Sequence, residues 1–226
     1  MNSAVVNYNN NDITIFYPVN TNEPVIKCIM KKKLWETNII KEFENEIQLG
    51  DTVLDIGGYV GTHTTVLSKI VGDLGRVFTF EPQPLIYKCL KKTIKTNRLT
   101  NVTLINKCVS NNNNRVLFTA TNNGRASITT IRPNLKDGAD NKVWVKSITI
   151  DELKLERCDF IKIDVELCEL LVLEGAMNTI LKYKPKIIIE VFPRNFDYIE
   201  GLLCTLDYKI KKNLSCHNYL CEPMPF

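Results

Sequence analysis

The residues best suited to chemistry lie in two short segments, each with an apolar stretch that leads into polar or glycine residues. The first segment, residues 51–61, reads DTVLDIGGYVG, and the second, residues 76–82, reads RVFTFEP. Glycines after a strand let the backbone approach a ligand, and a carboxylate about twenty residues downstream binds ribose hydroxyls. The glycine turn and Glu81 therefore predict a nucleoside-binding site at the edge of an α/β sheet.

The spacing of the glycines distinguishes between cofactors. Gly57, Gly58 and Gly61 give the pattern Asp-x-Gly-Gly-x-x-Gly, whereas the turn that binds a dinucleotide reads Gly-x-Gly-x-x-Gly. Such a turn does not have to accommodate a pyrophosphate, which favours S-adenosylmethionine over a nicotinamide dinucleotide. A nicotinamide-dependent dehydrogenase is the least favoured alternative.

Alternating strands and helices are expected to position these segments. Apolar runs and helical periodicity predict strands at 12–17, 52–57, 76–81, 102–106, 160–165 and 186–191, and helices at 35–48, 62–71, 84–97, 168–182 and 196–206, with short strands closing the chain. The runs at 160–163 and 187–189 suit strands of a parallel sheet that is covered by helices on both faces.

One stretch interrupts this alternation. Two antiparallel strands are expected at 115–121 and 143–150, and the polar residues 121–141 between them are expected to form a long loop. Long loops in compact domains are often functional, so Ser127 is a candidate to close over a ligand.

Length and composition favour one domain, with a lead-in at 1–34, a core at 35–192 and a C-terminal helix and strands at 193–226. The hydrophobic content of 44% and the charged content of 24% are ordinary for a globular protein, and a net charge of +4 makes a nucleic-acid partner unlikely. With neither a signal peptide nor a membrane span in the sequence, we expect a cytoplasmic protein without a membrane partner. The oligomeric state is not predicted.

The cysteines favour a reducing compartment. There are eight, none in a Cys-x-x-Cys pair, and several lie inside apolar runs, as expected of buried free thiols. Cys216, His217 and Cys221 form the one conceivable group of zinc ligands, and no metal site is expected there.

Further segments complete an ordered set. They are Trp35-Glu36, ITIDEL at 148–153, DFIKIDVE at 159–166, LEGA at 173–176 and PKIIIE at 185–190. With the glycine turn and Glu81, this set resembles the FkbM family of S-adenosylmethionine-dependent methyltransferases over residues 35–191. KIDVE is its most specific part.

The resemblance implies both a fold and an activity. The fold would be the class I methyltransferase fold, a Rossmann-like three-layer α/β sandwich with a mostly parallel seven-stranded sheet and an antiparallel C-terminal hairpin. The activity would be O-methylation with S-adenosylmethionine, and the expected partner is a small hydroxylated substrate, with a sugar or glycoconjugate precursor as the first choice.

The chain departs from the family pattern at three positions. Leu167 stands where the family usually has glycine, and it is expected to add bulk beside the mouth of the active site. Tyr59 replaces a frequent asparagine, and His63 lies where tyrosine or phenylalanine is common, so the methionine end of the cofactor is expected to be held differently.

Cofactor binding is assigned to residues around the two opening segments. Asp55 is expected to orient the turn or to bind the cofactor ammonium through water, and Glu81 to accept hydrogen bonds from both ribose hydroxyls. Cys108 falls where the family commonly has a small residue near the adenine, and a plain buried thiol is the equal alternative. The predicted set is Asp55, Gly57, Gly58, Tyr59, Gly61, His63, Glu81, Pro82 and Cys108.

Catalysis is assigned to carboxylates at the ends of two later strands. Asp164, Glu166 and Glu190 are expected at the sheet edge where open α/β sheets bind ligands. We predict Asp164 as the general base or substrate-orienting group, with Glu190 as its partner. Lys162 is expected to pair with a carboxylate, and His63 is an alternative base. A divalent cation held by these carboxylates is a less favoured alternative.

Two other functions remain open. The mild basicity and the long loop are compatible with an RNA or protein methyltransferase of the same fold. Leu167 motivates a catalytically silent protein that retains cofactor binding.

Overall fold

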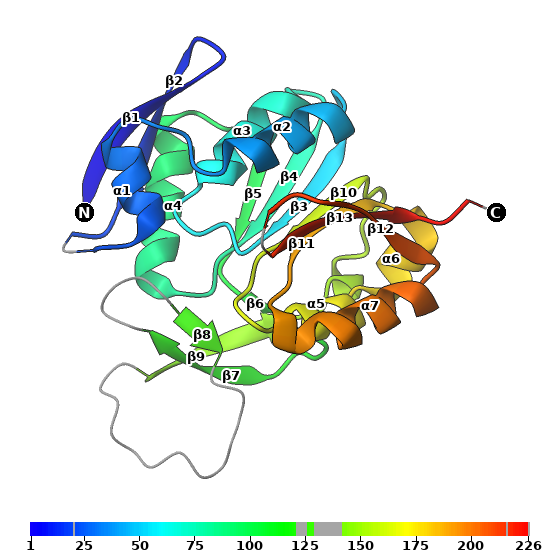
Figure 1. Ribbon diagram of the computed structural model, residues 1–226. Helices are drawn as coiled ribbons and strands as arrows, with labels where there is room; N and C mark the ends of the chain where they lie inside the picture. The colour runs from blue at the N-terminus through cyan, green and yellow to red at the C-terminus, as the bar shows by residue number, and fades with distance from the viewer. Residues whose placement is uncertain (20, 121–125, 129–141, 216, 226) are drawn as a thin grey trace.

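The computed structural model describes residues 1–19, 21–120, 126–128, 142–215 and 217–225 (Figure 1). A seven-stranded sheet lies at the centre, with helices on both of its faces. A hairpin at the N-terminal end and a smaller sheet lie beside this sandwich.

The central sheet has the strand order β12-β13-β11-β10-β3-β4-β5. Its strands are β3 (Thr52–Ile56), β4 (Arg76–Phe80), β5 (Val102–Ile105), β10 (Phe160–Ile163), β11 (Lys186–Glu190), β12 (Tyr208–Asn213) and β13 (Asn218–Pro223). The pairs from β11 to β5 are parallel, and β13 is antiparallel to both of its neighbours. This order confirms the fold expected from the sequence, including the antiparallel C-terminal hairpin.

Each face of the sheet carries its own hydrophobic core. Along β3, Val53 packs toward one face and Leu54 toward the other, and Phe160 and Ile161 of β10 alternate in the same way. One face carries α1 (Pro24–Met30), α2 (Thr37–Glu46), α3 (Thr62–Val71) and α4 (Pro84–Thr96), and the other carries α5 (Glu169–Glu174), α6 (Met177–Tyr183) and α7 (Phe196–Thr205). Strands that are buried on both faces explain why their sequences are continuously apolar.

The N-terminal residues form more structure than the sequence predicted. Strands β1 (Asn2–Tyr8) and β2 (Asn11–Tyr17) form an antiparallel hairpin whose turn residues, Asn9 and Asn10, both have positive φ. The hairpin is fixed to α4, because Asn97 accepts a hydrogen bond from the backbone N–H of Thr14 and donates one to its carbonyl. Only the second strand was expected.

The single helix predicted at 168–182 is wrong, because the chain breaks between α5 and α6. At Gly175 a Cβ atom would lie 2.0 Å from the carbonyl oxygen of Ser110, so only glycine permits this approach. Asp151 directly follows the strand expected at 143–150. Its carboxylate accepts hydrogen bonds from the backbone N–H groups of Asn178 and Thr179, in the first turn of α6, and so stabilises the start of that helix.

The smaller sheet has the order β6-β9-β7-β8 and the strands β6 (Cys108–Val109), β7 (Arg115–Ala120), β8 (Ala126–Ile128) and β9 (Lys142–Ile148). The antiparallel pairing of β7 with β9 confirms the two expected strands. Ser127 lies in β8, opposite Thr119, rather than in a continuous loop. The rest of the expected loop and the Ser127 side chain lie outside the described residues. Two 3-10 turns, Asp151–Leu153 and Pro193–Asn195, complete the elements.

Among the described helices, none has the length and apolar character needed to cross a membrane. The seven cysteines that the structure describes carry no disulfide.

The chain changes direction across the sheet at β3. From β3 it passes through α3 to β4 on one side, whereas β10 on the other side leads through α5 and α6 to β11. The carboxyl ends of β3 and β10 therefore flank a topological switch point, where open α/β sheets bind ligands.

Candidate active site

A cavity of about 370 Å³ opens at this switch point. The ends of β3, β4, β10 and β11 contribute to its wall, together with the first turn of α3 and the segments 23–25 and 35–36. This volume falls within the range of about 300–1,000 Å³ that is usual for small-molecule sites.

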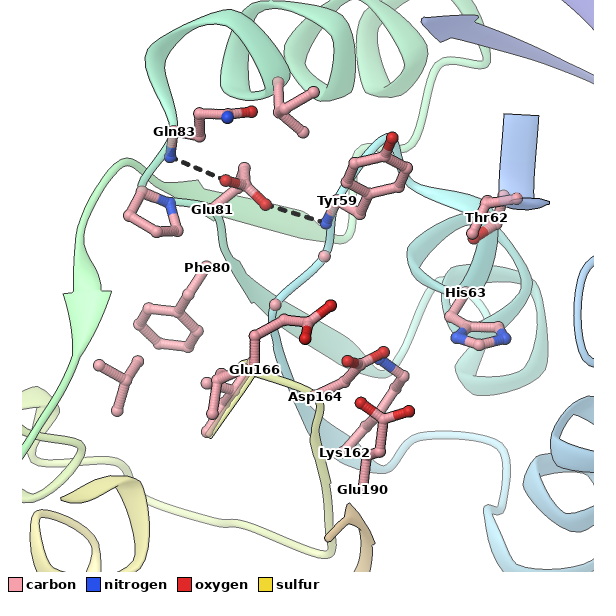
Figure 2. A pocket seen from close by; sticks show the side chains of 18 of the residues that line it. Tyr59, Thr62, His63, Phe80, Glu81, Gln83, Lys162, Asp164, Glu166 and Glu190 are labelled. Carbon is pink, nitrogen blue, oxygen red and sulfur yellow. Dashed lines mark hydrogen bonds and ion pairs between the residues drawn. The ribbon is translucent and has the colours of Figure 1, made fainter. Parts of the chain in front are cut away.

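Glu81, directly after β4, is held by the backbone around it (Figure 2). Its Oε2 accepts a hydrogen bond of 3.1 Å from the Tyr59 N–H, and its Oε1 accepts one of 2.8 Å from the Gln83 N–H. The side chain lines the cavity and is nearly buried. Burial raises the pKa of Glu81 to about 8, although the two N–H groups act in the opposite direction. Glu81 thus lies in the cavity beside the glycine turn.

The glycine turn is shaped by its close packing on neighbouring strands. Gly57 has φ of 93°, and a Cβ atom there would lie 1.9 Å from the carbonyl oxygen of Asp164. Gly57 and Gly58 line the cavity, but Gly61, at the start of α3, does not. A Cβ atom on Gly61 would lie 2.7 Å from Leu90 of α4. Gly57 and Gly61 are therefore needed for packing of the turn itself.

Asp55 lies behind the cavity and does not line it. Its carboxylate is fully buried and accepts a hydrogen bond of 2.6 Å from the Thr64 hydroxyl. Lys162, its direct neighbour on β10, places its ammonium 3.8 Å from Asp55 Oδ1. This position does not support direct cofactor binding by Asp55, and it agrees with the alternative role of orienting the turn.

Lys162 joins Asp55 to the edge of the cavity. Its ammonium also contacts Asp164 Oδ2 at 3.1 Å, and only 4% of the lysine side chain is exposed. Burial would lower the pKa of Lys162, but the carboxylates of Asp164, Asp55 and Glu36 outweigh it and raise the pKa. The lysine is charged, as expected from its pairing with carboxylates.

Asp164 and Glu190 share a hydrogen bond between their carboxyl groups, and both line the cavity. Burial, followed by the charges of Asp164 and Glu166, raises the pKa of Glu190 to about 8. Burial acts in the same direction on Asp164, but the Lys162 ammonium lowers the pKa of Asp164 below its ordinary value. At neutral pH, Glu190 is therefore protonated, and its O–H donates a hydrogen bond to the Asp164 carboxylate.

His63 is a neutral side chain in the cavity wall. It is 4% exposed, and burial lowers its pKa to about 3. The imidazole is hydrogen-bonded to the backbone of Trp35, whereas Nε2 lies 3.6 Å from Glu36 Oε2 and has no hydrogen-bond partner among the described residues. So low a pKa does not suit His63 as the alternative base.

The remaining predicted residues divide between the wall and its support. Tyr59, Pro82 and Cys108 line the cavity, and burial raises the pKa of the Cys108 thiol to about 12. Leu167 does not line the cavity itself but directly follows Val165 and Glu166, which do. Its φ of 76° gives the physical reason why glycine is usual at that position.

The sequence did not point to several residues of the wall. Gln83, two residues after Glu81, is 4% exposed, and its Oε1 has no hydrogen-bond partner in the described part of the chain. Lys107 and the segment 23–25 also contribute to the wall. The position of Gln83 just past a strand end was a usable signal, whereas the approach of residues 23–25 depends on the fold.

These groups fit the adenosine part of S-adenosylmethionine. Glu81 offers carboxylate oxygens for a diol, Gln83 offers an unpartnered buried amide oxygen for an N–H donor, and Phe80 and Ile86 supply apolar surface for a flat ring. Within the described residues, no group of three or more His, Cys, Asp or Glu side chains is arranged to hold a metal ion.

Solved structures resemble this fold. A methyltransferase FkbM from Methylobacillus flagellatus KT aligns with a TM-score of 0.54 and 21% identity over 75% of this chain and 42% of that chain. A putative rRNA methylase from Clostridium thermocellum aligns with a TM-score of 0.55 and 16% identity over 84% of this chain and 95% of that chain. At these identities the likeness concerns the fold alone.

Sequence comparisons are more specific. A protein-L-isoaspartate O-methyltransferase of Methanococcus maripaludis is 37% identical over 62 residues, 27% of this chain and 29% of that protein. The chain thus spans less than half the length of this relative and of the Methylobacillus structure. The sequence model of the methyltransferase FkbM domain matches residues 55–210, most of the chain. The family expected from the sequence is thereby confirmed: the chain belongs to the FkbM family of S-adenosylmethionine-dependent methyltransferases.

Proposed function

We propose that this chain transfers a methyl group from S-adenosylmethionine to a hydroxyl of a small molecule, with a sugar or glycoconjugate precursor as the first candidate class. One observation carries the proposal: the Glu81 carboxylate and the Asp164–Glu190 pair line the same cavity. A nucleoside-binding group and a proton-accepting group thus share one wall.

The cofactor would be held at the Glu81 end. Glu81 would accept hydrogen bonds from the ribose diol, while Tyr59 and Gln83 hold its carboxylate through their backbone N–H groups. Gly58, Pro82 and Cys108 contribute to the same wall. Bound there, S-adenosylmethionine supplies an activated methyl group, so the main task of the protein is alignment with the acceptor.

The acceptor would be positioned at the Asp164–Glu190 end. We assign the role of general base to Glu190. Its pKa is raised to about 8 whereas that of Asp164 is lowered, so the Glu190 carboxylate binds a proton more strongly than the Asp164 carboxylate does. The acceptor hydroxyl would give its proton to the Glu190 carboxylate. The bound cofactor would supply the methyl group to the oxygen and, with its methyl–sulfur bond broken, would leave as S-adenosylhomocysteine. Asp164, kept ionised by Lys162, orients the hydroxyl. This reverses the roles expected from the sequence.

Binding and transfer test the proposal separately. Calorimetry with S-adenosylhomocysteine should give saturable binding. Incubation with radiolabelled S-adenosylmethionine and either sugars or total RNA should label the small-molecule fraction. No binding by the wild-type protein would contradict the cofactor assignment, whereas label found only in RNA would favour the nucleic-acid alternative.

A further inference from the structure

The wall beyond the cofactor end is rich in hydrogen-bond acceptors. Four acidic residues line the cavity there: Glu36, Asp164, Glu166 and Glu190. Asp164 and Glu166 lie just after β10, and Glu190 is the last residue of β11 (Figure 2). Glu36 precedes α2 and lies close enough to Asp164 for the two charges to interact.

Cations on the described part of this wall are few. Lys162 is buried and already contacts two carboxylates, those of Asp55 and Asp164. Lys107 also lines the cavity but lies at the cofactor end, next to Cys108 and to Asn106, which donates a hydrogen bond to the Glu81 carbonyl. Of the two lysines, Lys162 acts on Glu36, but Asp55 and Asp164 share its charge.

His63 provides an independent sign of a missing donor. Its hydrogen bond to the Trp35 backbone supports the protonated form of the ring, as a bond donated to the carbonyl does. Nε2 is buried and has no hydrogen-bond partner among the described residues. When the neutral ring carries its proton on Nδ1, Nε2 is an acceptor, and it faces the carboxylate oxygen of Glu36 at 3.6 Å. A donor group of a ligand in the cavity would then serve both atoms.

We propose that Glu36 and His63, with Asp164 beside them, bind a protonated amine of the acceptor, so that the substrate is an amino alcohol or amino sugar rather than a phosphorylated sugar. This inference rests on the proposed function and narrows its substrate class. An ammonium donates to all three groups, whereas a phosphate would add negative charge beside carboxylates.

The test uses Trp35 as a reporter, because it lines the cavity and the chain has only one other tryptophan. In a Trp144→Phe background saturated with S-adenosylhomocysteine, Trp35 fluorescence is titrated with glucosamine, glucose and glucose 6-phosphate. These probes share one frame and differ in charge. Glucosamine should bind at least about tenfold more tightly than glucose, and glucose 6-phosphate least.

Variants assign the preference to the proposed residues. Glu36→Gln should lower the affinity for glucosamine to near the affinity for glucose. Glu156→Gln, at an exposed position, should leave the affinity for both sugars unchanged. Circular dichroism checks that both variants fold. A phosphate probe that binds as tightly as the amine, an amine that does not saturate, or a preference that survives Glu36→Gln would each overturn the proposal.

The methionine ammonium of the cofactor is the competing occupant. If Glu36→Gln weakens S-adenosylhomocysteine binding but leaves 5′-methylthioadenosine, which lacks the amino acid, unaffected, the site belongs to the cofactor and the proposal fails. Failure of wild-type protein to bind S-adenosylhomocysteine would instead contradict the proposed function.

Discussion

Glu81 Oε2 accepts a hydrogen bond from the backbone N–H of Tyr59, so the acidic residue after β4 is tied directly to the glycine turn after β3. The two segments that stood out in the sequence are thus physically joined in the wall of one cavity. This bond holds the carboxylate in one orientation before any ligand arrives, which reduces the ordering that binding requires.

The titration of Glu81 predicts a pH dependence of stability. Its pKa is raised from 4.5 to about 8, so the folded protein keeps a proton there that the unfolded chain releases. The resulting stabilisation is full below pH 4.5 and is lost as the pH rises through about 8. Without ligand, wild-type protein should lose stability over this window, and Glu81→Gln, which does not titrate, should lose less. Urea unfolding across the window measures the difference, and parallel curves would contradict the raised pKa.

The pH profile of methyl transfer tests the assignment of the base. Glu190 must be deprotonated to accept the hydroxyl proton, and burial raises its pKa to about 8. The rate of transfer should therefore rise with pH through about 8. Glu190→Gln should lower kcat by about 10²–10⁴-fold, the usual contribution of a general base. The pKa expected for Glu190 is about 8. If the transfer rate does not change with pH from about 6.5 to about 9, a range that brackets this pKa, Glu190 is not the base.

Lys162 is expected to stabilise the fold, because its buried ammonium contacts the carboxylates of Asp55 and Asp164. Lys162→Met removes the cation between Asp55 and Asp164 and leaves their carboxylates without it. The free energy of unfolding at neutral pH should fall by about 3–5 kcal/mol, as is usual when one partner of a buried ion pair is removed. Asp55→Asn in the same background should recover part of this loss. A neutral effect of Lys162→Met in chemical denaturation would contradict the pairing.

Two glycine-to-alanine substitutions form a matched pair. At Gly57 a Cβ would overlap the Asp164 carbonyl and φ is positive, whereas at Gly201, inside α7, no atom lies within 4 Å of the added Cβ. Gly57→Ala should lower the melting temperature strongly, and Gly201→Ala should raise stability by up to about 1 kcal/mol. Thermal unfolding of both variants checks this, and equal tolerance at the two sites would be inconsistent with the turn described here.

The sequence could predict the central strands because local features mark them: an apolar stretch along the strand and, after β4, an acidic residue at the strand end. Strand β3 is continuously apolar because both of its faces are buried, and Glu81 lies just past a strand end because ligands bind there. These features do not depend on neighbouring elements, so the positions of the central strands and of Glu81 at a strand end were predictable, whereas the type of sheet came from the family resemblance.

Other features depend on contacts between distant residues. The break after α5 is set by Ser110 and Asp151, which are far from Gly175 in the sequence. The roles within the Asp164–Glu190 pair depend on Lys162, because the cation decides which carboxyl keeps the proton. Residue type and spacing alone do not encode these relationships.

A double comparison tests most directly whether Glu81 binds the cofactor diol. S-adenosylhomocysteine and its 2′,3′-dideoxy analogue are titrated by calorimetry into wild-type protein and Glu81→Gln. Our account predicts that the substitution weakens S-adenosylhomocysteine by about 10-fold or more, as expected for a charged hydrogen bond, and barely affects the dideoxy analogue. An equal loss for both ligands, or no loss for either, would contradict it.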